Sequence, residues 1–240
     1  MTEAERILTE NRRRDQELDR SIYAAWQPAE LFMLQGRERV AARLLKSQDV
    51  FPVRGDRCLE IGFGTRGWLP TLLGWGLDSS DLYGMELDQG RAEVAIQAIP
   101  GGHLEIGDAR DLPWERDFFQ LVVASTVLSS ILDPNARQAV AREVMRVLQP
   151  GGAILIYDFR FNNPSNPQVR QLKKSEIKAL FPGCIGKIRS MTLVPPIARA
   201  VAPASWTLAT ILERLPFLRS HLVSVMVKPE DASPGQTTHA

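Results

Sequence analysis

The sequence predicts a doubly wound α/β fold built on a mostly parallel sheet of seven strands. Short apolar runs alternate with helical patterns along most of the chain, which indicates strands joined by crossover helices. The runs are continuous, without alternation of apolar and polar residues, and this is typical of strands that helices cover on both faces. A chain of 240 residues is long enough for one domain with a full core.

The strands are predicted from apolar runs that end at glycine, acidic or polar residues. Five of them fall between residues 56 and 159, and two more follow the polar, proline-bearing loop after Phe159. The predicted strands are 56–62, 81–87, 103–109, 118–125, 152–159, 185–196 and 221–229.

The helices are predicted from apolar residues that recur at helical spacing. Pro70 stands in the first turn of one of them, where its missing N–H costs little. The sequence QPGG at 149–152 is expected to end another before the fifth strand. The predicted helices are 29–48, 66–76, 90–99, 134–148 and 173–181, with a polar helical segment over 4–19.

These elements predict an N-terminal helical cap over 1–50 and a main domain over 51–229. An insertion at 196–220 precedes the last strand, and the polar tail 230–240 is expected to be disordered.

The composition is ordinary for a globular protein, with 44% hydrophobic and 24% charged residues, so it indicates no disordered or fibrous chain. The polar N-terminus has no apolar core of a signal peptide, and no run approaches about 18 uncharged apolar residues. Cys58 and Cys184 lie far apart without metal-ligand spacing, so we expect reduced thiols and no metal site. These features predict a cytoplasmic protein.

A glycine-rich turn follows the first predicted strand in the sequence CLEIGFGTRGW. Gly62, Gly64 and Gly67 form the pattern G-x-G-x-x-G, whose missing side chains let a ligand approach the backbone. The pattern also occurs in dinucleotide-binding turns, but Glu60 lies two residues before the first glycine and would repel a pyrophosphate. A ligand with an ammonium and a sulfonium group would be attracted instead, and S-adenosylmethionine is such a ligand.

At this point the chain resembles the class I S-adenosylmethionine-dependent methyltransferase family, over about residues 55–160. LEIGFG resembles the first motif of that family, LYGMEL the second and IGDARDLPW the third. FFQLVVASTVLSS is similar to the fourth strand with its exit loop, and RVLQPGG to the turn before the fifth strand. The resemblance implies the seven-stranded Rossmann-like methyltransferase fold, S-adenosylmethionine as cofactor and methyl transfer as activity.

The resemblance also implies roles for single residues. Glu86 would bind both ribose hydroxyls, Asp108 the adenine amino group, and Ser125 would lie near the methionine part. The order Arg66-Gly67 departs from the family pattern, which puts the role of Gly67 in doubt and leaves Arg66 pointing toward solvent or substrate. The cofactor-binding residues that we expect are Glu60, Gly62, Gly64, Glu86, Leu87, Asp108, Ala109 and Ser125.

The acceptor is less constrained than the cofactor. The C-terminal part resembles a bacterial subgroup associated with polysaccharide and natural-product gene clusters, which implies O-methylation of a sugar or small natural product. The alternatives are C- or N-methylation of a lipid-like or other small molecule, and a catalytically silent interaction module that only binds S-adenosylmethionine. No motif indicates a nucleic-acid partner.

A hydroxyl acceptor would need a general base. His221 at the start of the last strand and Asp158 at the end of the fifth strand are the candidates, because both are expected at the cofactor edge of the sheet. Asp158 with Asn162 and Asn163 is a remote alternative as a Mg²⁺ site. Tyr23 and Trp26 could close over the methionine moiety or simply pack in the N-terminal cap.

The C-terminal part is basic. Residues 159–228 carry eleven Lys and Arg against two acidic residues, a net charge of +9. The insertion 196–220 is interpreted first as a lid that walls the acceptor pocket. The alternative is a helix that makes weak contact with an anionic membrane surface, with Arg199, Arg214 and Arg219 near the headgroups.

Overall fold

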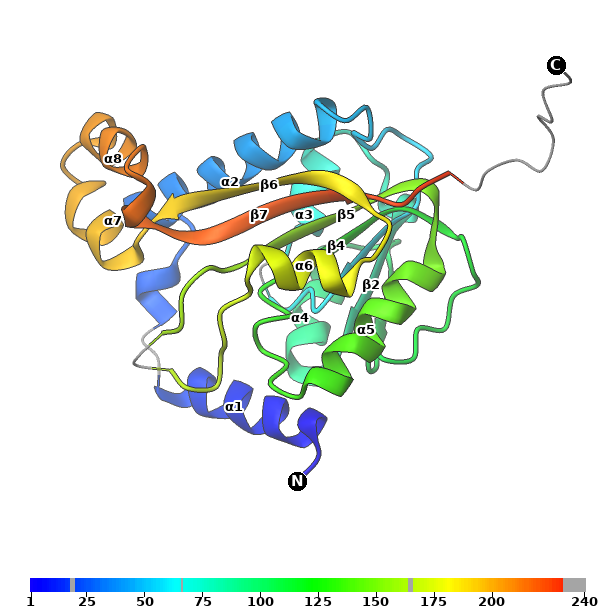
Figure 1. Ribbon diagram of the computed structural model, residues 1–240. Coiled ribbons are helices and arrows are strands. Elements are labelled where there is room, and N and C mark those ends of the chain that lie inside the picture. Colours follow the sequence, from blue (N-terminus) through cyan, green and yellow to red (C-terminus); the bar gives the residue numbers. More distant parts are fainter. Residues whose placement is uncertain (18–19, 66, 164–165, 231–240) are drawn as a thin grey trace, which may run out of the picture.

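A computed structural model describes residues 1–17, 20–65, 67–163 and 166–230 (Figure 1). It contains one seven-stranded sheet in the order β3-β2-β1-β4-β5-β7-β6, in which β7 is antiparallel to its neighbours β5 and β6 and the other pairs are parallel. This confirms the predicted fold class. The strands are β1 (Cys58–Ile61), β2 (Leu82–Glu86), β3 (His103–Ile106), β4 (Phe119–Ser125), β5 (Leu148–Phe159), β6 (Ile185–Leu193) and β7 (Arg219–Val227).

Helices cover both faces of the sheet. One face carries α2 (Pro28–Lys46), α3 (Leu69–Gly74) and α4 (Gln89–Ala98), and the other carries α5 (Pro134–Val147) and α6 (Lys174–Leu180) (Figure 1). The N-termini of α4 and α5 are capped by carboxylates, since Asp88 accepts a hydrogen bond from the Arg91 N–H and Asp133 from the Asn135 N–H. The helix α1 (Glu3–Glu17) lies apart from these layers.

Consecutive residues of a strand face opposite sides of the sheet, and β5 shows the consequence for the site. Ile154 and Ile156 belong to the core under α5 and α6, whereas Leu155 and Tyr157 belong to the core under α2 and α3. The side chain of Asp158, one residue beyond Tyr157, therefore faces the α5 side of the sheet.

The structure shifts element boundaries from their predicted positions, among them the starts of β5 and α3. β5 begins at Leu148, so QPGG lies within the strand, where Gly151 has a φ of 75° and the pairing with β4 changes register between Phe119 and Leu121. α3 begins at Leu69 because the preceding turn contains two glycines in the left-handed region. Of the expected disordered tail, residues 231–240 lie outside the described residues.

The predicted insertion forms α7 (Pro195–Val201), α8 (Trp206–Glu213) and the 3-10 turn η3 (Pro216–Leu218). Small side chains pack this segment against Phe32 of α2, and Figure 1 shows it at one end of the sheet. The small residues are Ala29, Ala198, Ala202 and Ala209. No helix among the described residues is long and apolar enough to cross a membrane.

Candidate functional site

A cavity of about 720 Å³ lies at the carboxyl ends of β1, β2, β3 and β4. Ligands of α/β sheets bind in this position because helix N-termini and strand-end side chains converge there. The structure brings all the residues predicted for the cofactor into its lining. They are Glu60, Gly62, Gly64, Glu86, Leu87, Asp108, Ala109 and Ser125.

The glycine turn adopts a backbone that other residues would strain. Gly62 has a φ of 64° and Gly64 a φ of 51°, both in the left-handed region. A Cβ atom on Gly62 would lie 2.5 Å from a methyl carbon of Val127, so the loop after β4 is packed directly on this glycine. Arg66, which the sequence left pointing toward solvent or substrate, lies outside the described residues.

Glu60 is fully buried at the end of β1 and lines the cavity. Its Oε2 atom accepts hydrogen bonds from the N–H groups of Trp68 at 2.7 Å and Leu69 at 3.0 Å, at the start of α3. Its Oε1 atom has no hydrogen-bond partner among the described residues. Burial raises the pKa of Glu60 to about 8, although these two hydrogen bonds and the positive charge of Arg37 oppose the rise. One of the two oxygen atoms of this buried carboxylate therefore remains without a hydrogen bond among the described residues.

Gly67, whose role the sequence left in doubt, makes room for that carboxylate. A Cβ atom on Gly67 would lie 2.3 Å and 2.6 Å from the two oxygen atoms of Glu60 and 2.6 Å from the carbonyl oxygen of Phe63. Only a residue without a side chain fits this position, so Gly67 permits the contact between Glu60 and the start of α3.

Replacing Gly67 with alanine is expected to lower the melting temperature by several degrees. The new methyl group would collide with a backbone carbonyl, which cannot rotate away, and overpacking of this kind costs about 1–3 kcal/mol. Thermal unfolding followed by circular dichroism measures the effect. Gly74→Ala is the matched control, because a Cβ atom there would meet nothing within 4 Å. Equal melting temperatures for the two variants would contradict the steric argument.

Glu86 ends β2 and fastens the glycine turn. Its Oε2 atom accepts a hydrogen bond from the Gly64 N–H at 2.7 Å, and its Oε1 atom accepts one from the Asp88 N–H at 2.9 Å. Burial raises the pKa of Glu86, and these two hydrogen bonds oppose the rise. A carboxylate has about four acceptor sites, so two remain for a ligand with neighbouring hydroxyl groups.

Asp108 follows β3 and forms an ion pair with Arg110, at 2.6 Å between Oδ2 and Nη2. Burial raises the pKa of Asp108, but the hydrogen bonds and charge of Arg110 outweigh burial, and the pKa falls below its ordinary value. Asp108 is therefore an ionised acceptor at the rim of the cavity. Arg110 also lines the cavity, so an incoming amino group would share the carboxylate with it.

Arg37 of α2 lines the cavity, and the sequence analysis missed it. Its guanidinium carbon lies 4.7 Å from the ring centroid of Trp68 and 5.9 Å from that of Tyr157. The Nε atom of Arg37 is buried without a hydrogen-bond partner among the described residues. The partly buried guanidinium of Arg37, whose Nη2 atom lies 3.4 Å from the Gly67 carbonyl oxygen, and the buried carboxylate of Glu60 thus line the same cavity, and each retains an unpaired polar atom.

Tyr157, another lining residue that the sequence analysis missed, explains where His221 lies. The rings of Tyr157 and His221 stack at 4.5 Å with an angle of 7°, and the Nδ1 atom of His221 lies 2.8 Å from the Ser220 hydroxyl. His221 itself is buried and does not belong to the cavity lining. Burial, with a contribution from the charge of Arg37, lowers the pKa of His221 to about 3. The structure therefore does not bring this candidate base to the cavity.

Asp158 also lies outside the cavity lining, and it points to the opposite face of the sheet from Tyr157. Its Oδ2 atom accepts a hydrogen bond from the Ser129 N–H at 3.0 Å and its Oδ1 atom one from the Phe159 N–H at 2.8 Å. Burial raises the pKa of Asp158 to about 6, against these hydrogen bonds. The placement of Asp158 indicates a residue that ties the loop after β4 to β5.

The remote Mg²⁺ alternative gains no support from this geometry. Both oxygen atoms of Asp158 accept backbone hydrogen bonds, and the Oδ1 atom of Asn162 accepts one from the Gln171 N–H. Within the described ranges, no group of three or more His, Cys, Asp or Glu side chains could hold a metal ion.

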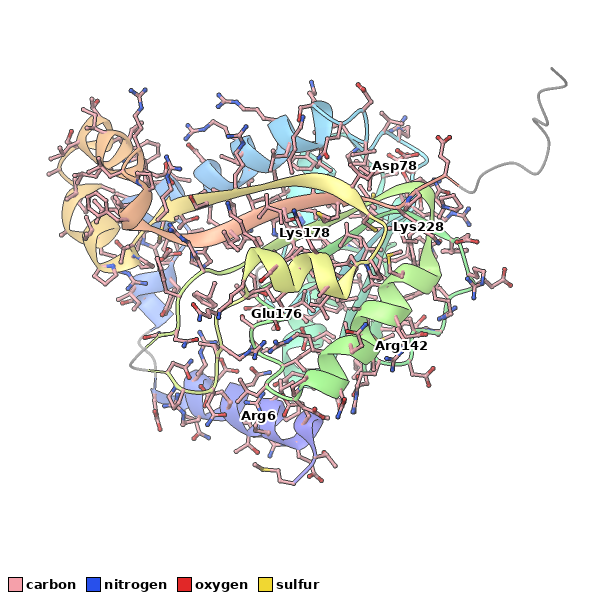
Figure 2. All side chains as sticks on the ribbon, viewed as in Figure 1. Arg6, Asp78, Arg142, Glu176, Lys178 and Lys228 are labelled. Atoms are coloured by element: carbon pink, nitrogen blue, oxygen red, sulfur yellow. The ribbon has the colours of Figure 1, made fainter. Side chains whose placement is uncertain are left out.

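The N-terminal helix α1 lies over the cavity and supplies polar and apolar lining residues. Arg6 of α1, labelled in Figure 2, donates hydrogen bonds to the Gln168 side chain and to the Ser130 carbonyl. Glu3 accepts one from the Leu132 N–H at 2.5 Å. The α1 residues that line the cavity are Glu3, Ala4, Ile7, Asn11, Arg14 and Asp15.

The two aromatic residues of the predicted cap differ in placement. Tyr23 lines the cavity, whereas Trp26 is 80% exposed. The segment 196–220, all of which the structure describes, contributes no residue to the lining and packs on α2 instead. The interpretation of this segment as a wall of the acceptor pocket does not match its position.

A family model described as a methyltransferase domain matches residues 59–156, from β1 to β5. Demethylmenaquinone methyltransferase of Clavibacter sepedonicus is 30% identical over 151 residues, which are 62% of this chain and 58% of that protein. (+)-O-methylkolavelool synthase of Herpetosiphon aurantiacus is 26% identical over 63% of this chain and 54% of its own length. The chain thus spans little more than half the length of these curated relatives.

Solved methyltransferase structures share the fold. A S-adenosylmethionine-dependent methyltransferase of Methanosarcina mazei superposes with a TM-score of 0.54 at 17% identity, over 73% of this chain and 93% of that one. Phosphoethanolamine N-methyltransferase 2 of Haemonchus contortus, solved with S-adenosylmethionine, superposes with a TM-score of 0.58 at 17% identity, over 80% of this chain and 53% of that one. With the glycine turn and the acidic strand ends, residues 59–156 thus form a methyltransferase domain, and the sheet has the fold of class I S-adenosylmethionine-dependent methyltransferases.

Proposed function

We propose that this protein transfers a methyl group from S-adenosylmethionine to a small, largely apolar acceptor. The observation that carries the proposal is the pair of strand-end carboxylates, Glu60 and Glu86, which share one cavity and retain free acceptor sites toward it. When bound, S-adenosylmethionine would supply a sulfonium methyl group whose carbon an acceptor nucleophile attacks in line, and S-adenosylhomocysteine would be the leaving group. The protein's task is then to hold the cofactor and the acceptor in the right geometry.

The proposed cofactor contacts follow from the donors and acceptors that remain free. Glu86 accepts hydrogen bonds from the two ribose hydroxyls, while Asp108, Leu87 and Ala109 surround the adenine. Gly62 and Gly64 keep the backbone open beside the ribose and methionine parts, and Ser125 lies near the latter. The Oε1 atom of Glu60 and the Nε atom of Arg37 are buried without hydrogen-bond partners among the described residues, and they fit the zwitterionic methionine part of the cofactor. Its ammonium group would lie at Glu60 and its carboxylate at Arg37.

The acceptor is proposed to be apolar because of the remaining lining. Several aliphatic side chains line the cavity beside its polar and charged residues, and the curated relatives are named for acceptors that include demethylmenaquinone and phthiotriol dimycocerosates. This favours the lipid-like alternative over a sugar. The aliphatic lining residues are Ile7, Leu34, Val94, Val127, Ile131, Ala136 and Val140.

The atom that receives the methyl group bears on the need for a base. O-methylation remains a prediction, and one relative is named for an O-methylated product. The two bases predicted from the sequence lie outside the cavity lining, so we propose that neither His221 nor Asp158 takes a proton from the acceptor. Full turnover in His221→Phe and Asp158→Asn variants that keep the wild-type melting temperature is the expected result.

Two measurements test the function. Calorimetry is expected to show binding of S-adenosylhomocysteine, and mass spectrometry is expected to show transfer of labelled methyl from S-adenosylmethionine to quinone or polyprenyl-alcohol acceptors but not to saccharides. Binding without transfer to any acceptor pool would favour the silent interaction module. Failure to bind S-adenosylhomocysteine would contradict the proposal as a whole.

A further inference from the structure

The surface of α8 and the turn that follows it is apolar and exposed. The helix buries Ala209 against α2 and turns Leu208 and Ile211 outward, and Leu215, which follows the helix, is exposed as well. Ile211 is 53% exposed, and Phe217 in η3 is 69% exposed. This segment therefore has an apolar face toward the protein and a second one toward solvent.

A second loop extends this surface. Arg160 donates a hydrogen bond to the Pro216 carbonyl at 2.6 Å, which places the loop after β5 beside η3. The ring of Phe161 lies 4.7 Å from the Arg160 guanidinium carbon and is half exposed. We call the combined surface the α8 face; it consists of Phe161, Leu208, Ile211, Leu215 and Phe217. Exposed apolar side chains that gather on one surface mark interaction sites.

The charges around the α8 face are positive. Arg214 is exposed directly after α8, and Arg160 lies beside Phe161 at the edge of the face. Glu213, the acidic residue of the same segment, turns inward and accepts a hydrogen bond from the Thr192 N–H at 3.0 Å. The other acidic residue of 159–228, Glu176, which Figure 2 labels, pairs with Arg137 and Arg170. Both acidic side chains of this region are thus hydrogen-bonded and only partly exposed, and the arginines at the face set its charge.

We propose that the α8 face docks this protein on membranes that contain anionic lipids. Apolar side chains with arginines at their edge suit a bilayer surface, where the former enter the acyl boundary and the latter meet phosphate groups. A second copy of this chain is a poorer partner, because a two-fold contact would bring the same arginines together from both copies. The helix α8 has 8 residues, so it would lie along the surface and not cross it.

The position of the α8 face connects docking to the cavity. Arg199 of α7 lies 5.2 Å from the ring of Tyr23 and 3.6 Å from Glu30, and both of these residues line the cavity. If the proposed function holds, docking would bring the end of the protein that contacts Tyr23 and Glu30 toward an acceptor dissolved in the bilayer. The docking itself does not depend on the proposed function.

Co-sedimentation with lipid vesicles tests the docking. The protein is expected to pellet with vesicles of phosphatidylcholine and phosphatidylglycerol at low salt, and to pellet much less with phosphatidylcholine alone or at high salt. The double variant Ile211→Asp, Phe217→Asp should lower the bound fraction about tenfold or more, and Arg214→Glu should lower it at low salt. No pelleting of the wild type with anionic vesicles at low salt would overturn the proposal.

Matched controls separate docking from general surface effects. Ile185→Asp makes the same change at a 79% exposed residue at the opposite end of β6, and Arg142→Glu makes the same charge reversal on α5 (Figure 2). Both should bind vesicles like the wild type, and equal losses in controls and face variants would overturn the proposal.

S-adenosylhomocysteine affinity, measured on every variant, should stay unchanged. A wild type that does not bind S-adenosylhomocysteine would contradict the proposed function and leave the vesicle result standing. Dimers that the double variant abolishes, with vesicle binding retained, would assign the face to self-association instead.

Discussion

Glu86→Ala is expected to weaken the binding of S-adenosylhomocysteine about a hundredfold or more. The variant removes an acceptor that we place on two ribose hydroxyls, and each hydrogen bond to a charged group contributes about 1.5–3 kcal/mol. It also frees the N–H groups of Gly64 and Asp88, so the glycine turn loses its fastening to β2. Isothermal titration calorimetry with S-adenosylhomocysteine measures the loss.

Two further variants make the Glu86 result specific. Glu86→Gln keeps the shape and one carbonyl acceptor, so we expect a loss between those of the alanine variant and the wild type. Glu93→Ala removes an exposed carboxylate of α4 that hydrogen-bonds to the Gln89 side chain, and it should bind like the wild type. Wild-type affinity in Glu86→Ala would exclude the ribose assignment.

Glu60→Gln is expected to weaken binding of S-adenosylhomocysteine strongly, while 5′-methylthioadenosine, which lacks the amino acid part, loses little. An amide cannot pair with an ammonium group as a carboxylate does, and the adenosine half does not contact Glu60 in our proposal. Binding to the wild type near pH 7 should also release a proton, because the pKa of Glu60 is about 8 without ligand and an ammonium group lowers it. Calorimetry in buffers of different ionisation enthalpy detects this proton, and the Gln variant should not release it.

The same carboxyl group makes stability depend on pH. The pKa of Glu60 is about 8 in the folded chain and near its ordinary value of 4.5 in the unfolded chain, so the folded state holds more protons between these values. The contribution of Glu60 to the free energy of unfolding is then fully present below about pH 4.5 and is lost as the pH rises through about 8. Glu60→Gln cannot ionise and should gain melting temperature relative to the wild type between about pH 5 and about pH 9. A constant difference across this range would contradict the buried, protonated carboxyl.

The acidic side of the cavity could be predicted from the sequence because strand order and strand direction determine it. In parallel strands, the residues at the carboxyl ends of β1 and β2 lie at the same edge of the sheet, so Glu60 and Glu86 must lie close together. Arg37 could not be predicted in the same way. It lies on a helix whose pattern only separates an apolar side from a polar side, and its burial depends on how α2 crosses Trp68 and Tyr157.

Strand register and side-chain packing explain why the two predicted bases, Asp158 and His221, do not line the cavity. The end of β5 does lie at the cofactor edge, but Tyr157 and not Asp158 lines the cavity, and a fully apolar strand does not indicate which of two consecutive residues does so. His221 is opposite Phe159 in the pairing of β5 with β7, as an antiparallel last strand requires. Its ring is separated from the lining by its stack on Tyr157, which no sequence pattern specifies.

Helix α1, which covers the cavity, is attached to the rest of the protein by contacts that affect how long a bound molecule stays. None of the residues Glu3–Glu17, all described, is fully buried, and α1 is attached to the body through contacts such as Arg91 with Asp15 at 3.2 Å and Asn11 with Asp88 at 3.3 Å. Exposed ion pairs and hydrogen bonds contribute about 1 kcal/mol or less each and weaken with salt. Detachment of α1 is therefore a local opening that costs far less than global unfolding. A higher ionic strength should therefore shorten the residence time of a ligand beneath α1.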